Sequence, residues 1–103
     1  MRRQGHYIDT NLMLARARRV AHESNGEVQK EEPAYIARIA AENAAWLVFV
    51  EKALDATTYD DFDGALGQAI QGLGVNRFTS DGASLCYQFT ERLALVLLDL
   101  PES

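Results

Sequence analysis

The chain of 103 residues has only one cysteine, two prolines and no long apolar run. Because Cys86 has no second cysteine to pair with, an intrachain disulfide is excluded, and we expect a reducing, cytoplasmic setting. The longest apolar runs, residues 44–50 and 93–98, are far shorter than the roughly 20 residues of a membrane-spanning helix. The N-terminal sequence MRRQGHYIDT lacks the apolar segment of a secretory signal, so we expect a soluble protein with no membrane partner.

The residues that are present suit one folded domain. Hydrophobic residues make up 48% of the chain and charged residues 24%, which is typical of globular proteins and unlike disordered segments. A chain of this length can bury a core without disulfides or metal ions. We therefore expect residues 1–103 to form a single domain that begins with a flexible segment at residues 1–7.

Four stretches have the apolar spacing of helices, and residues that start or stop a helix separate them. Asp9 or Thr10 can cap the first stretch, and an Asn-Gly pair can end it. Pro33 suits the first turn of the second stretch, and Thr58 can cap the third. The sequence predicts an all-α bundle of four helices at about residues 9–25, 33–54, 59–73 and 80–100.

The second predicted helix carries an apolar core face, but two of its residues break the pattern. Phe49 projects onto the opposite side, between Glu42 and Lys52, where an aromatic ring would be exposed in a monomer. Asn43 projects into the core face. Its amide either bonds to a neighbouring backbone carbonyl or fixes the register between helices or subunits, and the sequence leaves both open.

The fourth predicted helix also has more apolar surface than one core requires. Such a surplus indicates a helix buried on several sides or an interface between copies of the chain. We interpret it as a homodimer interface, with four residues as candidates for self-association: Phe49, Tyr87, Leu95 and Leu98.

Charge is distributed unevenly along the acidic chain, whose formal net charge is -5. Residues 1–30 hold six basic and three acidic groups, a net +3, while the other 73 residues hold four basic and twelve acidic groups, a net -8. Three of the basic groups are Arg16, Arg18 and Arg19, but Arg18 points about 100° away from Arg19 on a helix. Because the acidic remainder would repel phosphate, we do not expect nucleic acid as a partner.

One side of the first predicted helix has the composition of a protein-recognition surface: Leu12, Arg16, Arg19 and Glu23. Arginine combines an apolar stem with a forked donor for carboxylates, so aliphatic groups beside arginines suit a protein partner. A solvated helix face with an Arg19–Glu23 pair explains the same residues, and the sequence leaves both interpretations open.

Residues for catalysis or metal binding form no recognisable pattern. His22 stands beside Glu23 without a nucleophile signature, and Cys86 projects onto the core face of its helix. The acidic run YDDFDG at residues 59–64 lacks the ligand spacing of a calcium loop and suits the first turn of a helix. We expect no enzyme activity, no metal site and no cofactor.

These observations favour a small acidic cytoplasmic protein that binds another protein. We expect an inhibitor or regulator, of the physical type of anti-activators, immunity proteins and phage-type blockers, that occupies a partner's surface. The alternative is a helical module that binds a small molecule or nucleotide in a pocket near four residues: Tyr35, Trp46, Cys86 and Tyr87.

Overall fold

The computed structural model describes residues 2–3, 6–7 and 9–98, and four helices account for most of them. They are α1 (Thr10–Glu27), α2 (Pro33–Asp55), α3 (Tyr59–Gly72) and α4 (Ser80–Leu98). The predicted all-α class and the four helices are thereby confirmed, although α1 continues through the Asn-Gly pair expected to end it. The end predicted for the fourth helix, residues 99–100, lies outside the described residues.

Ahead of α1, two short strands pair in an antiparallel manner: β1 (Arg2–Arg3) and β2 (His6–Tyr7). They fall within residues 1–7, the segment expected to be flexible. The rest of that segment, residues 1 and 4–5, lies outside the described part of the chain.

Side-chain caps hold the starts of three helices. The Asp9 carboxylate accepts a hydrogen bond from the backbone N–H of Leu12 at 3.1 Å, as the sequence predicts for α1. The Thr58 hydroxyl accepts one from the N–H of Asp61 at 3.1 Å, and the Thr79 hydroxyl accepts one from the N–H of Gly82 at 3.1 Å. Each cap satisfies an otherwise orphaned amide, which typically contributes about 1 kcal/mol.

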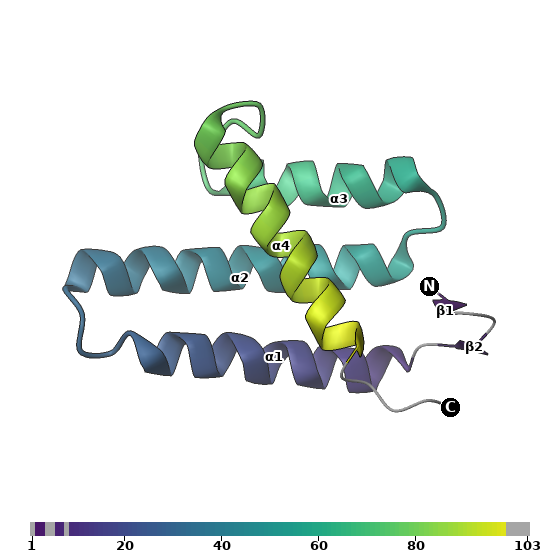
Figure 1. Ribbon diagram of the computed structural model, residues 1–103, viewed down its shortest axis with the longest axis horizontal. Helices are drawn as coiled ribbons and strands as arrows, with labels where there is room; N and C mark the ends of the chain where they lie inside the picture. The colour runs from purple at the N-terminus through teal and green to yellow at the C-terminus, as the bar shows by residue number, and fades with distance from the viewer. Residues whose placement is uncertain (1, 4–5, 8, 99–103) are drawn as a thin grey trace.

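The helices form a layer of three with a fourth lying across it. Figure 1 shows α1, α2 and α3 side by side, with neighbours antiparallel, and α4 crossing one face of this layer diagonally. The Cα positions span 44 × 29 × 16 Å, so the molecule is flat. As a result, α2 is enclosed by α1 on one side, α3 on the other and α4 above.

This central position of α2 explains why the predicted exposure of Phe49 is wrong. Phe49 is 0% exposed, with its ring centroid 5.4 Å from that of Phe62 on α3 and 6.1 Å from that of Phe89 on α4. A helical projection assumes one buried face, but α2 packs against three neighbours. Phe49 therefore belongs to the core rather than to a surface that could join two copies.

The connection between α3 and α4 relies on two glycines. Gly74 has φ +75°, a left-handed conformation that glycine adopts without steric cost. Gly82, in the first turn of α4, lies directly against the preceding loop, where a Cβ would come within 2.6 Å of the Arg77 Cα. This close approach fixes where α4 leaves the loop and begins to cross the layer.

Candidate functional site

A buried polar network joins α1, α2 and α4 at the centre of the molecule. The Arg92 guanidinium of α4 lies 4.2 Å from the centroid of the Trp46 ring, and its Nη1 donates to Asn43 Oδ1 at 3.0 Å. The Asn43 amide in turn donates to Asn25 Oδ1 at 2.8 Å and to the Ala21 carbonyl at 3.4 Å, both on α1. The Asn43 amide thus bonds to a backbone carbonyl, as one interpretation expects, and this carbonyl and its other two partners lie on other helices.

The charge of Arg92 has no carboxylate partner in this network. Within the described residues no ion pair reaches Arg92, and its Nη2 atom is buried without a hydrogen-bond acceptor. Burial lowers the pKa of Arg92, and the attraction of the more distant Glu42 offsets this only in part. The fold thus disfavours the charged form of a side chain that stays protonated at neutral pH.

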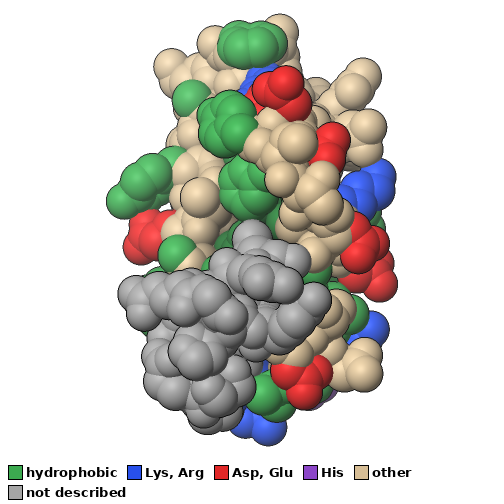
Figure 2. All heavy atoms as spheres, turned by 90° about the vertical axis from the view of Figure 1, so that its right-hand side faces the viewer, with side chains coloured by type: hydrophobic (Ala, Val, Ile, Leu, Met, Phe, Trp, Pro, Cys, Tyr) green, Lys and Arg blue, Asp and Glu red, His purple; other side chains and the backbone are tan. Residues whose placement is uncertain are grey.

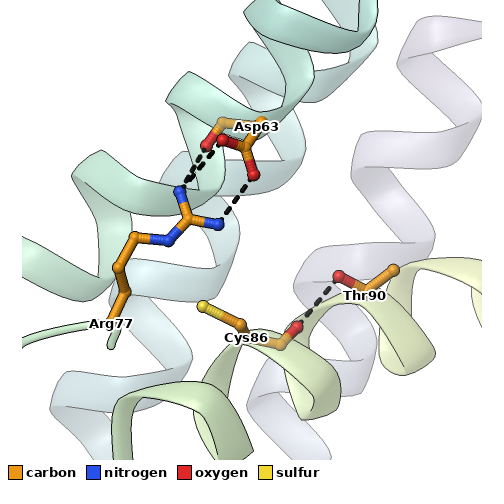
Figure 3. Close-up of polar contacts among 4 residues, drawn as sticks. All are labelled: Asp63, Arg77, Cys86 and Thr90. Atoms are coloured by element: carbon orange, nitrogen blue, oxygen red, sulfur yellow. Dashed lines mark hydrogen bonds and ion pairs between the residues drawn. The ribbon is translucent and has the colours of Figure 1, made fainter. Parts of the chain in front are cut away.

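A second arginine cluster, at the other end of α4, has the opposite character. Arg77, in the loop before α4, binds the Asp63 carboxylate of α3 with both terminal nitrogens, Nη2 to Oδ1 at 2.7 Å and Nη1 to Oδ2 at 3.2 Å (Figure 3). Nη1 also donates to the Asp63 carbonyl at 3.3 Å. The hydrogen bonds that Arg77 donates to the Asp63 side chain raise the pKa of Arg77.

Small groups and a thiol complete the surroundings of the Arg77–Asp63 pair. A Cβ at Gly67 would come within 2.9 Å of Arg77 Nη1, so glycine leaves room for the guanidinium. Figure 3 shows the half-buried Cys86 thiol pointing from α4 toward Arg77, while the Cys86 carbonyl accepts a hydrogen bond from Thr90 Oγ1 at 2.9 Å. The cluster thus ties the loop before α4 to α3.

Three of the four predicted partner-binding residues are exposed on one side of the edge helix α1, and the fourth, Arg16, is not. Leu12 is 36% exposed, and Arg19 and Glu23 are exposed as well. Arg16, predicted to face outward, is partly buried and in contact with other residues.

On α4, three predicted self-association residues are exposed. The exposed fractions are 69% for Tyr87, 58% for Leu95 and 71% for Leu98. Leu95 also lines a pocket of ≈ 230 Å³ with Val20 of α1, Val96 and Arg92. Of the predicted self-association residues, only Leu95 lines this pocket, and none of the predicted partner-binding residues does.

Apolar surface is also present at the end of the molecule where α2 leads into α3. Figure 2 shows hydrophobic side chains in a broken column down the upper half of this end, with acidic and basic side chains toward its edges. Tyr59, the first residue of α3, is 77% exposed. Exposed apolar groups are thus not confined to α1 and α4.

Among the pockets described for residues 9–98, none is lined by more than one of the four residues of the expected ligand pocket. Trp46 is 0% exposed in the core, and its indole N–H donates to the Phe89 carbonyl at 3.2 Å. Tyr35 instead lines a groove of ≈ 440 Å³ between α2 and α4, together with Arg38, Glu42, Asp81 and Gln88 among others.

Sequence reasoning missed Arg92 and Val20 as parts of the site. Arg92 projects onto the polar side of α4, and its contacts with Asn43 and Trp46 depend on the angle at which α4 crosses α2, for which the sequence holds no local signal. Comparisons of the chain with models of known protein families, with curated proteins and with solved structures found no match. Among the described helices, none has the length and apolarity needed to cross a bilayer.

Proposed function

We propose that this protein acts in the cytoplasm by binding another protein, as an inhibitor or regulator that occupies its partner's surface. The binding surface is the side of α1 that carries Leu12, Arg16, Arg19 and Glu23, here called the α1 surface. The observation that carries the proposal is the exposure of Leu12, Arg19 and Glu23 on one side of an edge helix. The proposal assigns no catalytic step to the protein.

The chemistry of the α1 surface suits a partner with both acidic and apolar groups. Arg19 supplies a forked donor for carboxylates, and Leu12 supplies apolar area about two turns away. The α1 helix is also held in place, because Asn43 binds both Asn25 and the Ala21 carbonyl. A surface whose backbone is fixed before binding loses less conformational entropy when a partner docks.

The test compares capture of proteins from the native cytoplasm by wild type and by a Leu12→Glu/Arg19→Glu variant. Arg18→Glu is the control for the charge reversal, because it makes the same substitution as Arg19→Glu on the same helix but points away from the α1 surface. We expect a protein that wild type and Arg18→Glu retain and that the double variant loses. Equal capture by all three, with equal helical circular dichroism, would overturn the assignment to α1.

A second candidate function is the binding of a small molecule or nucleotide in the groove beside Tyr35. Its ≈ 440 Å³ lies within the usual range for ligand pockets, and it offers a cation, Arg38, whose guanidinium lies 5.0 Å from the Tyr35 ring centroid. A melting-temperature screen against metabolites and nucleotides tests it. A shift that Tyr35→Ala abolishes would favour this function over protein binding.

A further inference from the structure

The last turn of α1 holds the asparagine of this chain that is most prone to deamidation. Asn25 is the only asparagine in the sequence that a glycine follows, and both Asn25 and Gly26 lie within α1, which ends at Glu27. Because glycine has no Cβ, no side chain shields its backbone nitrogen from the side chain of the preceding residue. The Gly26 nitrogen is therefore well suited to attack Asn25 once the backbone there is flexible.

The reaction requires no other reagent than water. The Gly26 nitrogen attacks Asn25 Cγ, so that a new C–N bond forms and the bond from Cγ to the side-chain nitrogen breaks. Ammonia leaves with the proton of the Gly26 N–H, which gives a five-membered succinimide ring. Water then opens this ring at either of its carbonyls, so residue 25 becomes aspartate or isoaspartate.

Helical geometry keeps the two reacting atoms apart. On a helix the Cα–Cβ bond of each residue tilts toward the N-terminus, and longer side chains turn back over the preceding turn. This geometry directs Asn25 Cγ away from the Gly26 nitrogen, which lies on its C-terminal side. The ring can therefore form only after the end of α1 has left the helical conformation.

Hydrogen bonds from two other residues hold Asn25 in place. Its Oδ1 accepts from Nδ2 of the buried Asn43 on α2 at 2.8 Å, and its backbone carbonyl accepts from Gln29 Nε2 at 2.8 Å. Gly26 is exposed, and nothing lies within 4 Å of the position that a Cβ would take there. Water thus reaches the pair, and the contacts of Asn25, rather than exclusion of water, oppose the reaction.

We propose that Asn25 is a modification site at which this protein deamidates, and that its hydrogen bonds with Asn43 and Gln29 set the rate by holding the end of α1 closed. The Asn-Gly pair favours an earlier end of the helix, and the bond to α2 opposes this tendency. A reaction confined to the open state proceeds in proportion to the population of that state, so loss of either bond accelerates it. Because ammonia is lost to water, closing of α1 does not reverse the change.

Mass spectrometry of the tryptic peptide of residues 20–30 measures the reaction, because Asn25 is the only asparagine in it. The full chain is incubated at mildly alkaline pH, with and without a denaturing concentration of guanidinium chloride, and sampled over time. We expect wild type to react about 100-fold more slowly when folded than when denatured, since two hydrogen bonds oppose the opening. Folded Asn43→Leu should react about tenfold faster than folded wild type, and Gln29→Ala, which removes an exposed bond, about threefold faster.

Gly82→Ala is the control that separates opening of α1 from a general loss of stability. It disturbs the loop before α4 and leaves the bonds of Asn25 intact, so we expect its folded form to react as slowly as wild type. Gly26→Ala in the Asn43→Leu background is the control for the chemistry. Its Cβ meets no other atom in the fold but shields the attacking nitrogen, so it should slow the reaction again.

Three results would each overturn the proposal: equal rates for folded and denatured wild type, Asn43→Leu that reacts as slowly as wild type, or Gly82→Ala that is accelerated as strongly as Asn43→Leu. If circular dichroism shows that Asn43→Leu does not fold, Gln29→Ala decides, and a rate equal to that of wild type overturns the proposal. The α1 surface does not include residue 25, so this proposal and the proposed function can fail separately.

Discussion

Arg77 and Arg92 are partly buried arginines at the two ends of the α4 region, and the fold treats them differently. Arg77 meets a carboxylate with both terminal nitrogens, at 2.7 and 3.2 Å, within a single corner of the molecule. Arg92 meets a neutral amide oxygen at 3.0 Å and an aromatic face at 4.2 Å, both on α2. The first cluster is electrostatically complete, and the second is not.

The pKa values of the two arginines are shifted in opposite directions, so the charge of Arg77 favours the folded state and the charge of Arg92 disfavours it. The pKa of Arg77 is raised by its hydrogen bond to Asp63, so the folded state favours the charged form. The pKa of Arg92 is lowered by burial, so the folded state disfavours the charge that Arg92 carries at neutral pH. Loss of Arg77 should therefore destabilise the fold more than loss of the charge on Arg92.

The largest expected effect comes from displacing the loop that holds Arg77. In Gly82→Ala the new Cβ would collide with the backbone of Asn76 and Arg77, which cannot give way as a flexible side chain would. We expect the free energy of unfolding to fall by about 3 kcal/mol, as measured by urea denaturation. Gly64→Ala is the control, because nothing lies within 4 Å of its Cβ, and it should be neutral or slightly stabilising. A change below about 1 kcal/mol in Gly82→Ala would contradict the close approach.

Removal of the amide at the centre of the Arg92 cluster should cost somewhat less. Asn43→Leu keeps a similar volume but leaves Arg92 Nη1 without its acceptor and Asn25 Oδ1 without its donor. We expect a loss of about 2 kcal/mol in chemical denaturation, because partly buried polar groups are then left unsatisfied. Asn11→Leu, on the exposed side of α1, should stay within about 0.5 kcal/mol of wild type. Equal stability of the two variants would mean that the network contributes little.

Local features of the fold could be predicted from the sequence, whereas features set by the crossing of α4 could not. The caps at Asp9 and Thr58 and the start of α2 at Pro33 were correct, because they depend on residues within one turn. The position of Phe49 was wrong, because it packs against helices that come from distant parts of the chain. The outward position of Arg16 was also wrong, because its side chain is partly buried. A helical projection describes one helix and holds no information on which neighbours cover it.

In the candidate site, too, features of a single helix could be predicted, whereas features that depend on the crossing of helices could not. Exposure of Tyr87, Leu95 and Leu98 followed from the pattern of α4 alone and is confirmed. The pocket between Val20 and Leu95 requires the angle between α1 and α4, so it appears first in three dimensions. Self-association and partner binding themselves stay predictions.

The ion pair at Arg77 should contribute a smaller, measurable coupling. A double-mutant cycle with Arg77→Met, Asp63→Asn and the combined variant isolates the interaction from the packing of each side chain. We expect a coupling of about 1 kcal/mol, since the pair is bidentate but its side chains remain 26% and 39% exposed. The coupling should shrink in 1 M NaCl, because salt screens exposed charges. A coupling that is zero at low salt would show that the pair does not stabilise the fold.

The smallest effect on stability is expected from substitution of Arg92 itself. Arg92→Met loses the contact with the Trp46 ring and the bond to Asn43 but also removes a partly buried charge whose Nη2 has no acceptor. Because these contributions oppose each other, we expect a change within about 0.5 kcal/mol. The measurement is urea denaturation of wild type and Arg92→Met at the same protein concentration. A loss above about 2 kcal/mol would show that the contacts with Trp46 and Asn43 outweigh the cost of burying this charge.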